Sequence, residues 1–123
     1  MEELVARLVA NVGVDRTAAE KSVGIILDFL SKEGPADKVK ALIDRLPGAE
    51  ALLQAQQAAD AGGGGMFSMG GIMGAGTKMM AAGLSMGQVQ GVTKEVIAYS
   101  REKAGEDAIG EIVGAIPGLS QFI

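Results

Sequence analysis

The sequence contains no cysteine, histidine or tryptophan, and only one tyrosine and three phenylalanines among its 123 residues. Without cysteine there is no disulfide framework, no thiolate zinc site and no thiol nucleophile. Without histidine the chain lacks the commonest general base, the commonest metal ligand and the usual pH switch. We therefore predict a non-enzymatic, cytoplasmic protein with no cofactor and no bound metal.

Basic residues are also scarce, with 11 lysines and arginines against 15 acidic residues and a net charge of −4. Nucleic-acid binding depends on clustered lysine and arginine that neutralise phosphates, so no nucleic-acid partner is expected. Glu2 and Glu3 stand where a signal peptide carries positive charge. No run of about 18 residues is apolar enough to predict a membrane span.

Glycine, in contrast, is abundant: there are 19, and all but four lie from Gly62 onward. Apolar residues make up 48% of the chain and are mostly aliphatic. A chain of this length forms one domain and buries roughly two thirds of its unfolded surface. We predict a single all-α domain spanning residues 1–123, with an aliphatic core.

Apolar residues at helical spacing predict helices over residues 2–11, 15–33, 35–46, 49–59, 85–103 and 106–116. Asp15 is the expected N-cap of the second helix, and Ser85-Met86-Gly87-Gln88 has the pattern of a capping box. The side chains expected to face the core are Leu4, Val5, Leu8, Val9, Val12, Ala19, Val23, Ile25, Ile26, Leu27, Phe29, Leu30, Val39, Leu42, Ile43, Leu46, Val89, Val92, Val96, Tyr99, Ile109, Ile112, Val113 and Ile116.

The two halves of the chain correspond at an offset of 70 residues. Val39, Leu42, Ile43, Leu46, Pro47 and Gly48 align with Ile109, Ile112, Val113, Ile116, Pro117 and Gly118, and Asp15 aligns with Ser85. Shared caps, breakers and core positions favour an internal repeat, although two unrelated amphipathic helices can also be aligned. The prediction is a bundle of six or seven helices made of two pseudo-symmetric three-helix repeats, residues 1–53 and 74–123, with a Gly-rich connector at 60–73. Residues 74–82 then form a glycine-weakened first helix of the second repeat.

Two glycine motifs imitate catalytic or nucleotide sites. Gly71 to Lys78 has the glycine spacing of a phosphate-binding loop, but its last residues are Thr-Lys where the motif needs Lys before Ser or Thr, and no strand precedes it. Gly83-Leu-Ser-Met-Gly87 matches a nucleophile elbow, yet the chain has no histidine to activate Ser85. We interpret the first motif as part of the fold and Ser85 as a helix cap.

Methionines and paired acids are the remaining candidates for chemistry. Thioethers bind Cu(I), but without Cys or His the affinity is poor, and methionine more often fills gaps or forms adaptable surfaces. The methionines concerned are Met66, Met69, Met73, Met79, Met80 and Met86. Glu2-Glu3 and Glu106-Asp107 lie in first turns of predicted helices, where the helix dipole stabilises acids.

The stretches GVDRTAAEKSVGIILDFL and DRLPGAEALL resemble an uncharacterised bacterial family of small all-helical proteins, a domain of unknown function with a Gly-rich middle and a Leu-Pro-Gly helix stop. The resemblance covers about the first 55 residues, and IPGLSQFI more loosely. It implies an all-helical fold and transfers no catalytic residue.

We predict a small scaffold or protein-interaction domain that self-associates into a homo-oligomer, with a further protein partner as an open possibility. The expected contact surface consists of Met66, Phe67, Met69, Ile72, Met73, Met79, Met80, Phe122 and Ile123. Exposed apolar residues in a region of low charge usually indicate a partner. The alternative is a peripheral membrane or lipid-associating protein that uses the Gly/Met-rich segment 62–87, although the acidic balance disfavours anionic lipid.

Overall fold

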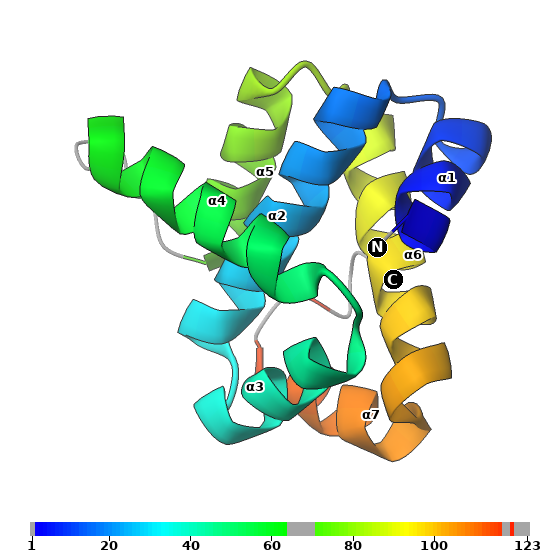
Figure 1. Cartoon of the computed structure of the whole chain (residues 1–123), viewed down its shortest axis with the longest axis vertical. Helices are drawn as coiled ribbons and strands as arrows, with labels where there is room; N and C mark the ends of the chain where they lie inside the picture. Colours follow the sequence, from blue (N-terminus) through cyan, green and yellow to red (C-terminus); the bar gives the residue numbers. More distant parts are fainter. Residues whose placement is uncertain (1, 64–70, 117–118, 120–123) are drawn as a thin grey trace.

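The computed structural model of the chain describes residues 2–63, 71–116 and 119 (Figure 1). In this described part the protein forms an all-α bundle and contains no strand. Its helices are α1 (Glu2–Asn11), α2 (Arg16–Glu33), α3 (Ala36–Arg45), α4 (Ala49–Gly63), α5 (Gly71–Ala81), α6 (Met86–Ala104) and α7 (Glu106–Ala115). The all-α bundle predicted from the spacing of apolar residues is confirmed.

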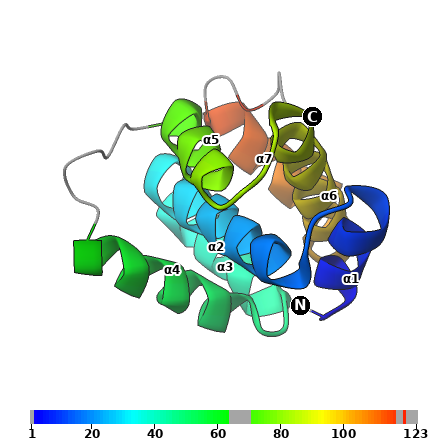
Figure 2. The same cartoon turned by 90° about the horizontal axis from the view of Figure 1, so that it is seen from above.

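Helix α2 is the centre of the bundle, and α1, α3, α4, α5 and α6 all pack against it. In Figure 1, α1 and α6 stand together on one side of α2, and α3 and α7 lie together at one end. Figure 2 shows α4 and α5 on different flanks of α2. Every residue from Ser22 to Leu30 is buried, because neighbouring helices surround this part of α2.

The helix ends follow local chain chemistry. Gly13 and Gly83 close the loops before α2 and α6, with φ angles of +82° and +107°, which glycine adopts without a Cβ penalty. Ser85 forms the predicted capping box: its hydroxyl accepts from the Gln88 backbone N–H at 3.2 Å, and its own N–H donates to Gln88 Oε1 at 2.9 Å. Asp15 stands at the predicted N-cap position of α2, but its side chain makes no capping hydrogen bond.

The predicted core is confirmed at nearly all positions, and Val12 and Val113 are partly buried against it. Val9 is the exception, since 41% of its surface is exposed. The prediction was wrong there because Leu4, Val5 and Leu8 already fill the buried face of the ten-residue α1. Helix α4 is longer than expected and continues through Gly63, and α5 begins at Gly71, so helix occupies both ends of the segment 60–73.

Polar clasps join helices that are distant in sequence. Arg7 of α1 donates two hydrogen bonds to the Glu102 carboxylate of α6, at 2.7 and 3.0 Å, and its guanidinium lies 5.5 Å from the centre of the Tyr99 ring. Lys38 of α3 pairs with Glu111 of α7. Among the described helices, none is both long and apolar enough to cross a membrane.

Candidate functional site

The largest described hollow that combines apolar and charged side chains is a groove of about 500 Å³ over one face of α2, between α4 and α5. Each helix contributes a stripe at i, i+3 or i+4 spacing, so the three stripes run along one channel. The lining residues are Thr17, Glu20, Lys21, Gly24 and Ile25 from α2, Leu52, Ala55 and Gln56 from α4, and Lys78, Ala81 and the adjacent Ala82 from the end of α5. A volume of this size lies in the range of small-molecule sites, roughly 300–1,000 Å³.

One glycine sets how closely α4 rests on α2. A Cβ placed at Gly24 would lie 2.9 Å from the backbone oxygen of Leu52 and 3.3 Å from the Cβ of Gln56. The two helices therefore touch backbone to backbone at this point. The small side chains of Ala55 and Ala81, both exposed, then leave the space beyond the crossing open.

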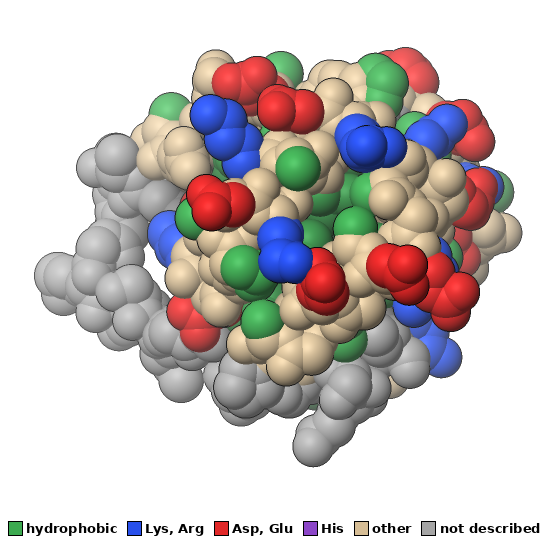
Figure 3. All heavy atoms as spheres, turned by 90° about the horizontal axis from the view of Figure 1, so that it is seen from below, with side chains coloured by type: hydrophobic (Ala, Val, Ile, Leu, Met, Phe, Trp, Pro, Cys, Tyr) green, Lys and Arg blue, Asp and Glu red, His purple; other side chains and the backbone are tan. Residues whose placement is uncertain are grey.

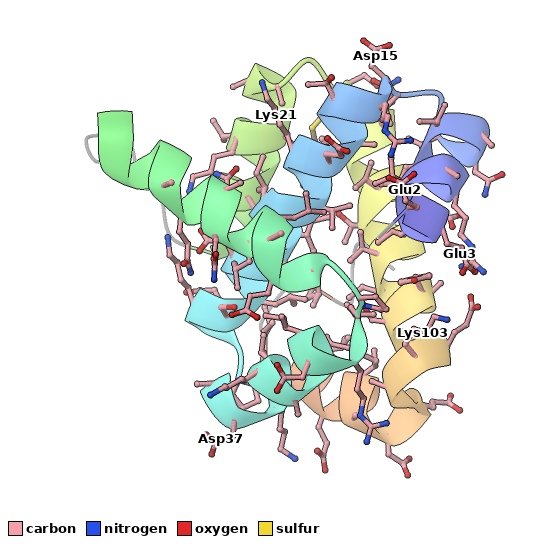
Figure 4. The ribbon with its side chains drawn as sticks, viewed as in Figure 1. Glu2, Glu3, Asp15, Lys21, Asp37 and Lys103 are labelled. Carbon is pink, nitrogen blue, oxygen red and sulfur yellow. The ribbon has the colours of Figure 1, made fainter. Side chains whose placement is uncertain are left out.

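The groove carries two lysines from different helices, Lys21 on α2 and Lys78 on α5. Figure 4 shows Lys21 beside α5, near the end of the bundle where Asp15 lies. Within the described residues Lys21 makes no ion pair. Glu20 also lines the groove, but its carboxylate lies 3.7 Å from Nε of Arg16, one helical turn away. The groove is thus locally basic in a protein of net charge −4.

Surface charge elsewhere is mixed. On the face seen in Figure 3, acidic and basic side chains alternate around a central group of apolar atoms, with no extended region of one sign. Glu2 pairs with Arg16, and Glu3 lies 3.8 Å from Arg7. The hydrogen bond from Arg16 lowers the pKa of Glu2, and the hydrogen bonds from Arg7 lower the pKa of Glu102. These acids are surface ion-pair partners, in keeping with their interpretation as solvated helix-start charges.

The motifs that imitate catalysis are helical in the structure. Residues 71–78 lie within α5, so they form no loop that cradles phosphate. Both polar atoms of the proposed nucleophile elbow at Ser85 are used by the capping box. In the part of the chain that is described, no group of three or more Asp or Glu side chains has the geometry of a metal site.

The structure divides the predicted contact surface. Met79 is only 2% exposed and belongs to the core, so its assignment to a surface was wrong: α5 turns this side chain inward. Met80, the next residue, is 48% exposed, and Met86 is 55% exposed. Ile72 and Met73 lie in α5, but their side chains are outside the described set. Met66, Phe67, Met69, Phe122 and Ile123 lie outside the described residues.

Sequence reasoning missed the groove and one buried acid. Asp28 is 2% exposed, with Oδ2 lying 3.0 Å from Nζ of Lys32 and Oδ1 without a hydrogen-bond partner in the described part. Helical periodicity marks one inward stripe and cannot show that neighbouring helices surround α2. The one available signal was the small residue Gly24 among large apolar residues, which often marks a close helix approach.

Comparisons with known protein families, with curated proteins and with solved structures find no match to this chain. The resemblance carried by the first 55 residues therefore stays a prediction.

Proposed function

We propose that this protein is a non-enzymatic binding module and that the groove between α2, α4 and α5 is its binding site. The observation that carries the proposal is the combination of ligand-sized volume, apolar alanine and leucine walls, and two lysines at one place. Sites for small molecules are typically apolar hollows with a few polar groups that orient the ligand. The ionisable groups that line the groove are Glu20, Lys21 and Lys78, a set with no nucleophile and base pair.

The groove can be tested with a neutral, environment-sensitive dye such as Nile red. Ala81→Phe fills the groove from α5, and Ala55→Phe fills it from α4. Ala41→Phe is the matched control, because Ala41 is exposed on α3 and does not line the groove. We expect the two groove variants to weaken dye binding at least about tenfold, equivalent to about 1.4 kcal/mol. Dye binding by Ala81→Phe at the wild-type level would contradict the proposal.

We also propose that residues 2–46 and 72–116 are two copies of one three-helix unit. The supports are that α2 and α6 start at Arg16 and Met86, that α3 and α7 start at Ala36 and Glu106, and that α1 packs on α6 as α5 packs on α2. An experimental structure in which residues 16–45 fail to superpose on 86–115 would contradict this.

The proposed correspondence places the groove where the second copy is closed. At the contact of α1 with α6, the Val12 side chain packs against Gly91, and a Cβ there would lie 3.2 Å from Val12 Cγ2. The residues at the matching positions are Ala82 and Lys21, which are among those lining the groove. A smaller side chain on one helix and a flexible lysine on the other leave open a corner that valine fills in the related half.

Self-association is a second candidate, favoured by the exposed side chains of Met80 and Met86. Large apolar side chains at the surface become favourable contacts when a second copy covers them. Light scattering should show an oligomer that Met80→Gln combined with Met86→Gln converts to monomer. A wild-type protein that is monomeric at high concentration contradicts this candidate, and flotation of the protein with liposomes would favour the lipid-associating alternative for segment 62–87.

A further inference from the structure

Two lysines face one groove from different helices, and this is an unusual arrangement unless an anion accompanies them. Lys21 belongs to α2 and Lys78 to α5, helices that pack directly on each other. Like charges that share a hollow with apolar walls focus a positive potential into it. The one acid in the lining, Glu20, has Arg16 beside it at 3.7 Å. The groove therefore attracts a negative group even though the whole protein is acidic.

The rest of the lining suits a hydrocarbon. Ile25 and Gly24 form the floor, Leu52 and Ala55 form one wall, and Ala81 contributes to the other. Apolar area removed from water contributes about 25 cal/mol per Å², so an alkyl chain lying on these side chains gains binding energy along its length. A ligand that satisfies the whole groove has one anionic end and one apolar body.

The dimensions favour a thin ligand over a protein helix. The lining of α2 runs from Thr17 to Ile25, which is about 12 Å of helix at a rise of ~1.5 Å per residue. An α-helix with side chains is ~10 Å wide, so a matching length occupies roughly 900 Å³. The groove measures about 500 Å³. It fits a single extended chain better than a partner helix.

We infer that the groove binds a free single-chain anionic amphiphile, such as a fatty-acid carboxylate. Its head group lies between Lys21 and Lys78, and its alkyl chain lies along α2 between α4 and α5. This inference rests on the proposed binding function and adds the class of ligand.

The test is competition against Nile red with three ligands of equal chain length: decanoate, decanol and decyltrimethylammonium. The variants are Lys21→Gln, Lys78→Gln and the double variant, with Lys94→Gln as the matched control on the exposed face of α6. These are surface changes, and circular dichroism confirms that each variant is folded. Decanoate should displace the dye at a lower concentration than decanol, and the cationic ligand should be the weakest. An exposed ion pair is worth up to about 1 kcal/mol, so each lysine variant should weaken decanoate about threefold to fivefold and leave decanol unchanged.

The outcomes separate the two proposals. If decanol competes as well as decanoate and the lysine variants change neither, the ligand class is wrong, and the loss of dye binding in Ala81→Phe still supports the groove. If Ala81→Phe binds dye like the wild type, the groove itself is not a binding site and both proposals fail. If Lys94→Gln weakens decanoate binding as much as Lys21→Gln does, the lysine effect is a general charge effect and the head-group position is wrong.

Discussion

The missing side chain of Gly24 brings α2 against the backbone of α4 at Leu52, with only 2.9 Å between the Leu52 oxygen and the place that a Cβ would occupy. This contact holds α4 at one edge of the groove. It also explains why the middle of α2 is buried on all sides.

Gly24→Ala should lower the free energy of unfolding by about 1–3 kcal/mol, because the added methyl group meets a backbone atom that cannot rotate away. Gly110→Ala is the matched control: Gly110 is also inside a helix, but nothing lies within 4 Å of the place that its Cβ would occupy. Alanine should stabilise α7 by about 0.5–1 kcal/mol. Urea unfolding measures both, and a Gly24→Ala protein as stable as Gly110→Ala would show that α4 does not rest on α2 in this way.

Ser85→Ala should cost about 1 kcal/mol of stability, since it removes the hydroxyl that accepts from the Gln88 N–H. Asp15→Ala should cost less, because the Asp15 side chain makes no capping hydrogen bond. Thermal unfolding compares the two helix starts under the same conditions. Equal losses would mean that the capping box contributes no more than an uncapped start.

Met79 and Met80 are neighbours with opposite environments, at 2% and 48% exposure. Met79→Ala should lower the free energy of unfolding by about 2–5 kcal/mol, because it leaves a cavity in the core. Met80→Ala should change stability by less than about 0.5 kcal/mol, as surface substitutions usually do. Chemical denaturation of the two variants checks which methionine α5 turns inward, and a reversed order would contradict the packing of α5.

Acid should destabilise the protein partly through Glu2 and Glu102. Arginine hydrogen bonds lower the pKa of both carboxylates in the folded protein. A lowered pKa means that the folded state holds protons less tightly than the unfolded state, so the stabilisation is present above the ordinary carboxyl range and is lost as the pH falls through the folded pKa. The melting temperature should therefore drop between about pH 5 and pH 3.

Glu102→Gln should make this acid limb shallower, whereas Glu33→Gln, which removes an exposed carboxylate without a described ion pair, should leave it unchanged. Because these pairs are at the surface, salt should reduce the difference between wild type and Glu102→Gln. An acid limb with the same slope in both variants would contradict the role of the Arg7–Glu102 pair.

Local chemistry written in the chain determined where most helices begin and end. Gly13, Gly34-Pro35 and Ser85 act within a few residues of themselves, so their effects can be read without knowing the fold. Periodicity identified most inward-facing positions for the same reason, because it depends only on the pitch of a helix. It was wrong for Val9 and Met79, where neighbouring positions on one helix compete for the buried side.

Only the tertiary structure decided which helices meet, and the candidate site depends on that. Lys21, Ala55 and Lys78 are ordinary residues on three separate helices, with no shared motif. They line one groove because α4 and α5 both pack on α2, and because Gly24 lets α4 come close. Packing between distant helices depends on the shapes of several surfaces at once, so no short stretch of the chain contains the information. The burial of Asp28 has the same origin: the chain alone shows a charged residue on a helix, and the surrounding helices make it part of the interior.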